Sequence, residues 1–214
     1  MGGALGDLRI LDFSRVLAGP LATMVLADLG AEVVKVERRG AGDDTRAWGP
    51  PWADDGSATY FHAVNRNKRS LALDLADPGD RAHARRLAAE ADVVVENFRP
   101  GVMERHGLGW AELAAQRPAL VYCSITGFGA GAGAELPGYD LVVQALGGLM
   151  SITGEADGPP LKVGVALVDV LTGLNAFSGI LLALRRRDQG GGAQRLEVDL
   201  LSSLLAGLVN AGSA

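Results

Sequence analysis

Short apolar runs alternate with amphipathic segments along the chain, and this alternation predicts an α/β fold. Short apolar or alternating runs, of which 32–37 is rich in β-branched residues, predict strands at residues 8–13, 32–37, 70–75, 92–96, 120–125 and 195–199. The segments between them predict helices at 20–29, 80–91, 101–106, 110–116, 139–150, 165–187 and from 200 to about 210. Strands that alternate with helices form parallel sheets. We therefore expect a Rossmann-like, doubly wound, mostly parallel sheet with helices on both faces.

The last part of the chain departs from this regular alternation. The helix predicted at 165–187 is long and strongly apolar, so we expect it to be buried. A glycine turn at 190–192, a strand and the beginning of an apolar helix follow it. We expect a large domain over residues 1–187. Residues 188–214 would be the strand and helix that start a truncated continuation, the beginning of a linker towards a second domain.

The same apolar stretch raises the question of a membrane span. Polar residues recur along it, namely Asp169, Thr172, Asn175 and Ser178. A charged residue at the centre of a membrane helix costs about 3 kcal/mol on insertion scales. We therefore expect a buried helix and no membrane association.

Composition narrows the classes of partner and site. A net charge of −5 and only 5% aromatic residues argue against a nucleic-acid binder. Cys123 is the only cysteine, which excludes an intrachain disulfide and a multi-cysteine metal site. The three histidines lie far apart without the spacing of metal ligands, so we expect no metal. The single cysteine, and an N-terminal segment interrupted by Asp7 and Asp12, favour a cytoplasmic protein.

Asp169 is the most unusual residue, because it stands alone among apolar neighbours. Removing a carboxylate from water is costly and raises its pKa unless a partner stabilises the charge. No Lys, Arg or His lies between Val163 and Leu184 to pair with it. Either a residue from a distant part of the fold pairs with the carboxylate of Asp169, or the desolvation cost is tolerated because the carboxylate takes part in a reaction.

The first strand–helix–strand unit invites comparison with dinucleotide-binding proteins. Glu37 ends the second predicted strand, where a ribose-binding acid could lie. However, the turn at 14–20 lacks the G-x-G-x-x-G pattern that lets a backbone approach a pyrophosphate. The sequence therefore argues against a standard NAD site and against a nucleotide-dependent oxidoreductase.

Basic residues cluster locally although the chain is acidic overall. They are Arg38, Arg39, Arg66, Lys68, Arg69, Arg99 and Arg105, all near the ends of predicted strands. If they gather at the carboxyl edge of the sheet, they would suit a phosphorylated cofactor. Spacing alone equally allows a scatter of solvated charges.

Five motifs, in this order, resemble the class III CoA-transferase family (CaiB/BaiF type). They lie at residues 12–20, 35–38, 65–68, 96–101 and 124–129. The family includes formyl-CoA transferase, carnitine CoA-transferases and α-methylacyl-CoA racemase. Its members are about twice as long as this chain, which therefore resembles their N-terminal half.

This resemblance implies a role for individual residues. The catalytic aspartate of the family falls on Asp169. The adenosine and phosphates of CoA would be held near Val16, Leu17, Ala18, Arg38, Leu73, Asn97, Phe98 and Arg105. Trp48 and Tyr139 match positions that line the acyl pocket of formyl-CoA transferase-like members.

The resemblance also implies partners. Acyl-CoA and CoA would be substrates, a carboxylic acid would accept the CoA, and no cofactor would be bound permanently. The full-length protein would form an interlocked homodimer. In the family, a glycine-rich loop of the other half completes the active site.

Two departures bear on the reaction. Related formyl-CoA transferases carry glutamine where this chain has Leu17, which argues against the smallest polar acyl groups. Racemases carry a catalytic histidine where this chain has Tyr139, whose ordinary pKa of about 10 suits a neutral-pH proton shuttle poorly. We therefore expect CoA transfer through an aspartyl anhydride and thioester. A racemase-type enzyme and a non-catalytic CoA-binding fragment are the alternatives.

Overall fold

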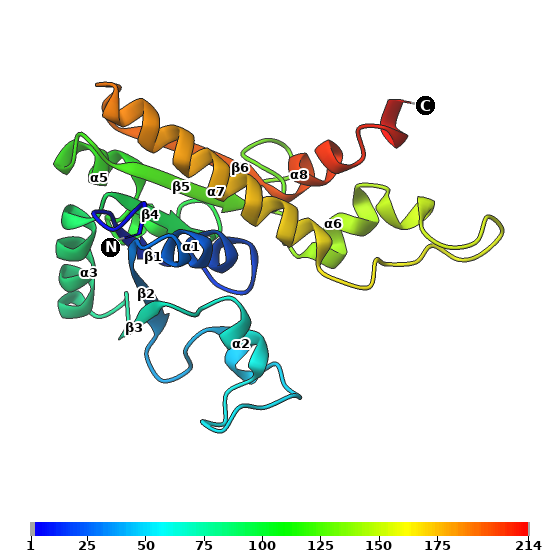
Figure 1. The fold of residues 1–214 in the computed structure, drawn as a ribbon, viewed down its shortest axis with the longest axis horizontal. Helices are drawn as coiled ribbons and strands as arrows, with labels where there is room; N and C mark the ends of the chain where they lie inside the picture. The colour runs from blue at the N-terminus through cyan, green and yellow to red at the C-terminus, as the bar shows by residue number, and fades with distance from the viewer. Residues whose placement is uncertain (1–2, 214) are drawn as a thin grey trace.

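A six-stranded parallel sheet forms the centre of the molecule in the computed structural model, which describes residues 3–213 (Figure 1). Its strands are β1 (Arg9–Asp12), β2 (Glu32–Arg38), β3 (Lys68–Leu73), β4 (Val93–Glu96), β5 (Val121–Thr126) and β6 (Gln194–Asp199). They are arranged in the order β3-β2-β1-β4-β5-β6, and every neighbouring pair is parallel. This is the strand order of a doubly wound Rossmann-type sheet, so the predicted fold class is confirmed.

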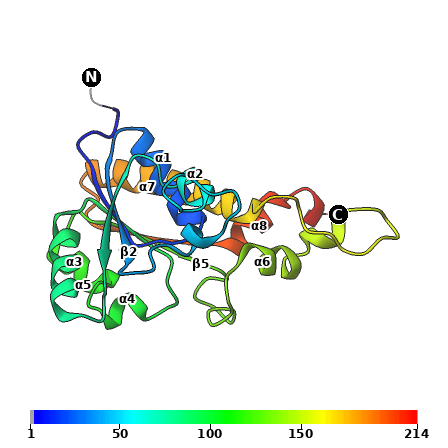
Figure 2. The same ribbon diagram turned by 90° about the horizontal axis from the view of Figure 1, so that it is seen from below.

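Helices cover both faces of the sheet. On one face lie α1 (Ala18–Asp28) and α7 (Leu167–Asp188), and on the other α3 (Pro78–Glu90), α4 (Val102–Arg105) and α5 (Trp110–Gln116) (Figure 2). The connections contain α2 (Thr59–Ala63), α6 (Asp140–Leu146) and the 3₁₀ turns η1 (Asp44–Ala47), η2 (Leu149–Ile152) and η3 (Ala211–Ser213). Helix α8 (Leu200–Gly207) follows β6 and packs against α7.

Alternate side chains of the central strands feed two separate cores. Ile10 and Val93 belong to the core beneath α1 and α7, whereas Leu11 and Val94 belong to the core beneath α3 and α5. Successive side chains of a strand point to opposite faces, and here both faces are covered. The run Val-Val-Val-Glu of β4 is therefore buried at every position.

Helix α7 is long and apolar enough to cross a membrane by length and composition alone. Its buried positions include Val168, Thr172, Ala176, Ile180 and Ala183, which recur every three or four residues. That spacing places them on one stripe, which packs against α1 and the sheet. The predicted long helix is confirmed, and its burial pattern is that of a core helix.

Glycines explain the largest difference from the predicted helices. The helix predicted at 139–150 ends at Leu146, because Gly148 adopts a left-handed conformation with φ of 86° before a separate 3₁₀ turn. The turn η1 and helix α2 lie between the predicted strands at 32–37 and 70–75, where no helix was predicted. Both of these short elements span too few residues to show a helical repeat.

The segment after residue 187 extends the same sheet. Strand β6 pairs in parallel with the whole of β5 and forms one edge of the sheet. The predicted division of the chain at residue 187 stays a prediction. The connection between β5 and α7, which contains α6, extends beyond the sheet at the end where α8 and the start of α7 also lie (Figure 1).

Candidate active site

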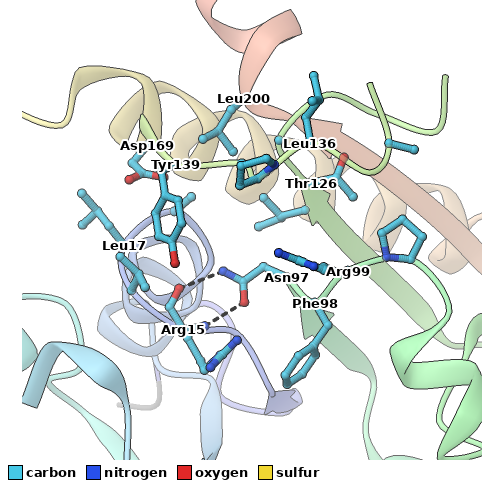
Figure 3. Close-up of a pocket in the computed structure, with 18 of the residues that line it drawn as sticks. Arg15, Leu17, Asn97, Phe98, Arg99, Thr126, Leu136, Tyr139, Asp169 and Leu200 are labelled. Carbon is cyan, nitrogen blue, oxygen red and sulfur yellow. Dashed lines mark hydrogen bonds between the residues drawn. The ribbon is translucent and has the colours of Figure 1, made fainter. Parts of the chain in front are cut away.

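A pocket of about 180 Å³ opens where the strand order reverses between β1 and β4. Ligands of doubly wound sheets bind in this crevice, outside the carboxyl ends of the strands. Segments that follow β1, β4 and β5 form its walls, together with the start of α7. Asp169 and Tyr139 both line it (Figure 3).

Asp140 fixes the first turn of α7, which carries Asp169. The residue before this helix is Ala166, whose side chain cannot cap it. Instead, Oδ2 of Asp140 accepts hydrogen bonds from the backbone N–H groups of Val168 and Asp169, at 2.8 and 3.0 Å. These bonds satisfy donors that a helix start leaves unpaired and place a second carboxylate near Asp169.

Asp169 has the electrostatics of a reactive carboxylate. Burial, and then the nearby charge of Asp140, raise its pKa from 3.8 to about 7. Within residues 3–213, no cation or hydrogen-bond donor binds its side-chain oxygens. A poorly solvated, unpaired carboxylate that titrates near neutrality is a strong nucleophile or base.

Tyr60 shares this electrostatic environment. Burial, followed by the charges of Asp169, Asp140 and Asp43, raises its pKa to about 12. The phenol therefore stays protonated at neutral pH and can donate a hydrogen bond. Its ring centroid lies 5.8 Å from that of Trp48, which is 46% exposed.

The start of α1 forms another wall of the pocket. Leu17 and Ala18 line it, and within the part of the chain that the structure describes, their backbone N–H groups have no acceptor. The N-terminus of a helix carries partial positive charge and favours negative charge nearby. The pocket therefore combines a lone carboxylate with unpaired backbone donors.

A cationic residue occupies the end of the pocket away from Asp169 (Figure 3). The guanidinium of Arg15 lies 5.2 Å from the ring centroid of Phe98 and 3.2 Å from a carboxylate oxygen of Asp44. Asn97 accepts from the backbone N–H of Arg15 and donates to its carbonyl oxygen.

Most of the predicted site residues meet at this pocket. Its lining includes Asp169, Tyr139, Val16, Leu17, Ala18, Asn97 and Phe98. The other predicted residues are not part of its wall. Leu73 is buried at the carboxyl end of β3, Arg38 and Arg105 are exposed, and Trp48 lies beside Tyr60. The roles given to all of these residues stay predictions.

The basic residues around the start of β3 do not gather at the carboxyl edge. Arg66 binds Asp28 at the end of α1, Arg69 binds Glu32, and Lys68 forms a buried ion pair with Asp12. Of the two arrangements that the spacing allowed, a single cluster at the carboxyl edge is therefore wrong for these three, because they lie just before or at the start of β3, at the opposite end of the strand, where carboxylates pair with them. Within residues 3–213, no group of three His, Cys, Asp or Glu residues could hold a metal ion.

Sequence reasoning missed the contribution of Asp140 and the pocket positions of Arg15 and Thr126, whereas Arg99 of the basic residues named above does line the pocket. One signal for Asp140 was available. A long helix that starts after Ala166, without Ser, Thr, Asp or Asn at its start, needs a cap from elsewhere.

Comparisons with known proteins agree with this geometry. A profile of the family described as CoA-transferase family III matches residues 5–212. Succinate–glutarate CoA-transferase of Agrobacterium fabrum is 48% identical over 212 residues, which cover 96% of this chain and 53% of that protein. Succinyl-CoA:glutarate CoA-transferase of Mus musculus is 50% identical over 203 residues, which cover 94% of this chain and 46% of that protein.

The crystal structure of a CaiB/BaiF family protein from Brucella suis has a TM-score of 0.96 and 46% sequence identity to this chain. The match covers 100% of this chain and 57% of the Brucella protein. The chain spans about half the length of the curated relatives it matches.

Proposed function

The chain belongs to CoA-transferase family III, and from that premise we propose that its protein moves CoA from an acyl-CoA thioester to a carboxylic acid, with Asp169 as nucleophile. The observation that carries the proposal is the unpaired carboxylate of Asp169, whose pKa burial and Asp140 raise to about 7. It lies in a pocket at the ligand-binding crevice of the sheet.

In the first step, the carboxylate of Asp169 attacks the thioester carbonyl carbon. The C–S bond breaks, CoA leaves as a thiolate, and a mixed anhydride joins the acyl group to Asp169. The attacked carbonyl oxygen becomes negative in the transition state. The unpaired N–H groups of Leu17 and Ala18 are suited to stabilise this charge, because helix N-termini favour anions.

The remaining steps reverse this chemistry on a second acid. The CoA thiolate attacks the aspartyl carbonyl, which releases the donor acid and leaves a CoA thioester on Asp169. The acceptor carboxylate then attacks this thioester, giving a new anhydride and free thiolate. Attack of the thiolate on the acyl carbonyl yields the new acyl-CoA and regenerates Asp169. Anhydrides and thioesters have similar reactivity, so no step requires a large input of energy.

Substrate binding follows the carboxyl edge of the sheet. We assign CoA to Val16, Leu17, Ala18, Arg38, Leu73, Asn97, Phe98 and Arg105. Leu17 and Ala18 line the pocket with Asp169, so we place the thioester end of CoA against them and the adenosine and phosphates against the others. Arg38 at the end of β2 and Arg105 at the end of α4 are exposed and suit phosphates, and Phe98 offers an aromatic face. Trp48 and Tyr139 would border the acyl group. The relatives act on succinate and glutarate by name, which supports short dicarboxylic acids as donor and acceptor.

Mass spectrometry tests the proposal directly. Full-length protein incubated with succinyl-CoA should gain an acyl or CoA adduct on the peptide that carries Asp169. The Asp169→Asn variant should form no adduct and lose transfer to glutarate. Full transferase activity in Asp169→Asn would overturn the assignment of the nucleophile.

A further inference from the structure

The turn between β1 and α1 is held by buried side chains rather than by its own backbone. The N–H of Ser14 donates to Oδ1 of Asp12 at 2.9 Å, and its carbonyl oxygen accepts from Nζ of Lys35 at 2.8 Å. Arg15 is bound through both its N–H and its carbonyl by Asn97, at 2.9 and 2.8 Å. Side chains from three different segments thus fix four consecutive backbone groups.

Val16 completes the turn in a conformation that it disfavours. Its φ is 70°, in the left-handed region, where a β-branched residue is a genuine outlier. Its N–H points to Oδ1 of Asp43, at 3.4 Å, and Thr45 donates to the same oxygen through its N–H and hydroxyl. A strained residue persists only where its surroundings over-determine it, and such residues cluster at functional sites.

Asp12, Lys35 and Asp43, which hold this turn, belong to two buried ion pairs. Nζ of Lys35 lies 2.8 Å from Oδ2 of Asp43, and the two side chains are 1% and 0% exposed. Nζ of Lys68 lies 3.0 Å from Oδ2 of Asp12, with side chains that are 2% and 0% exposed. Burying ion pairs often stabilises a fold less than apolar residues of the same volume would. A contribution to fold stability is therefore a weak explanation for the presence of these four buried charges.

The positions of the residues that follow the turn indicate a role for the four charged residues. Leu17 and Ala18 come directly after Val16 and line the pocket with Asp169, whereas Lys35 and Asp43 do not reach it. We infer that Lys35 and Asp43, supported by Asp12 and Lys68, are positioning residues that lock Val16 in its left-handed conformation and so aim the N–H groups of Leu17 and Ala18 into the pocket. This inference rests on the proposed function of Asp169.

Two matched double variants isolate this role. In Lys35→Met/Asp43→Asn, residue 43 keeps an oxygen that accepts from Val16, whereas in Lys35→Met/Asp43→Leu it does not. Both remove the ion pair, and they differ in the acceptor that residue 43 offers to Val16 and Thr45. A purely structural role predicts a lower free energy of unfolding for the Leu variant but equal acylation rates for the two folded proteins. We expect the Leu variant to acylate Asp169 at least about tenfold more slowly than the Asn variant, with a smaller effect on the KM for acyl-CoA than on this rate.

The acylation rate is measured on full-length protein by quenched incubation with succinyl-CoA and mass spectrometry of the Asp169 peptide. Arg117→Met is the control, because it removes a partly buried ion pair with Asp92 that touches neither the turn nor the pocket. It should acylate at the wild-type rate. Equal rates in the two double variants would overturn the positioning role. A wild-type protein that forms no adduct would instead refute the proposed function.

Hydrogen exchange on the unaltered protein tests the inference if the double variants do not fold. The amides of Arg15 and Val16 should exchange as slowly as that of Phe13, which donates to Val95 in the sheet. Exchange as fast as in exposed loops would show that the turn is not held, and would overturn the inference.

Discussion

Asp169 is half-buried and has no partner for its charge, and this combination sets its chemistry. Most buried carboxylates in this chain are stabilised. Burial acts to raise the pKa values of Asp12 and Glu37. Nearby cations and hydrogen bonds outweigh it and lower both pKa values to about 2. Asp169 receives no such compensation, so burial and Asp140 raise its pKa to about 7.

Burial also raises the pKa of Glu96 to about 7, but that carboxylate accepts a hydrogen bond from the N–H of Phe98 and does not line the pocket of Asp169. Asp169 is therefore the carboxylate with a raised pKa that is both unpaired and in the pocket.

This raised pKa predicts opposite effects of pH on stability and on activity. The folded protein binds a proton at Asp169 that the unfolded chain has already lost, so stability should fall as the pH rises from 3.8 through about 7. The carboxylate is the nucleophile, so kcat/KM should rise through about pH 7. Asp169→Asn should lose activity yet unfold at higher denaturant above that pH, with a gain of at most about 4 kcal/mol.

Chemical denaturation of both proteins at several pH values measures this effect. Asp188→Asn at the exposed end of α7 serves as the control, and its stability should stay within about 0.5 kcal/mol of the wild type. If Asp169→Asn were no more stable than the wild type at alkaline pH, the carboxylate would not carry the burial cost described here.

The sequence alone could indicate Asp169 but not Asp140, which fixes the start of its helix. A lone carboxylate in an apolar run is visible locally, and the order of motifs around it indicated its family. Asp140 binds the N–H of Val168 across 28 residues of sequence, through a cap that no local pattern marks. The same holds for Lys35 and Asp43, because residues that tie a turn from other strands become neighbours only when the sheet assembles.

The packing of α1 against α7 places the start of α1 opposite Asp169 in the pocket. Gly173 lies where α7 crosses α1, and a Cβ atom there would come within 2.7 Å of the carbonyl oxygen of Ala18. The helices can approach this closely only because the residue is glycine. The distance between Asp169 and the start of α1 therefore depends on the packing of two elements.

Gly173→Ala should therefore force the two helices apart. We expect the free energy of unfolding to fall by about 1–3 kcal/mol and kcat to fall at least about tenfold, since Ala18 lines the pocket. Gly179→Ala, one to two turns further along α7, is the matched control. A Cβ there meets Leu196 at an ordinary 3.7 Å, and the variant should be neutral or more stable by up to about 1 kcal/mol.

Denaturant unfolding and steady-state kinetics of both glycine variants decide the matter. Equal stability and activity in the two proteins would show that the close contact between α1 and α7 is unimportant. The contact itself was beyond sequence reasoning, because Gly173 fits a helical pattern and reveals its packing role only through its neighbour on another helix.

At the scale of the whole molecule, the alternation of elements could predict a parallel sheet but not its strand order. The reversal between β1 and β4 creates the crevice, and it follows from how the crossovers pack. Large apolar side chains remain exposed on α6, the first half of α7 and α8, which contact one another, including Leu146 at 64%, Leu174 at 45% and Leu205 at 53%. We propose that a second copy of the full-length protein covers this region in a homodimer.

Charge introduced into this region should weaken the proposed dimer. The double variant Leu146→Glu/Leu205→Glu should raise the dimer dissociation constant at least about tenfold, because it leaves charges in an apolar contact. Leu29→Glu, at the other end of α1, should leave it unchanged. Sedimentation equilibrium measures all three proteins, and equal association of wild type and double variant would contradict the proposed interface.

The central claim is that Asp169 carries the reacting acyl group and CoA in turn. Oxygen transfer tests it most directly, because every turnover of the proposed mechanism removes one carboxylate oxygen of Asp169 and replaces it with one from the acceptor acid. Full-length protein turning over succinyl-CoA and glutarate labelled with oxygen-18 should therefore become heavier at the Asp169 peptide and at no other. Formation of glutaryl-CoA with that peptide unlabelled would contradict the account.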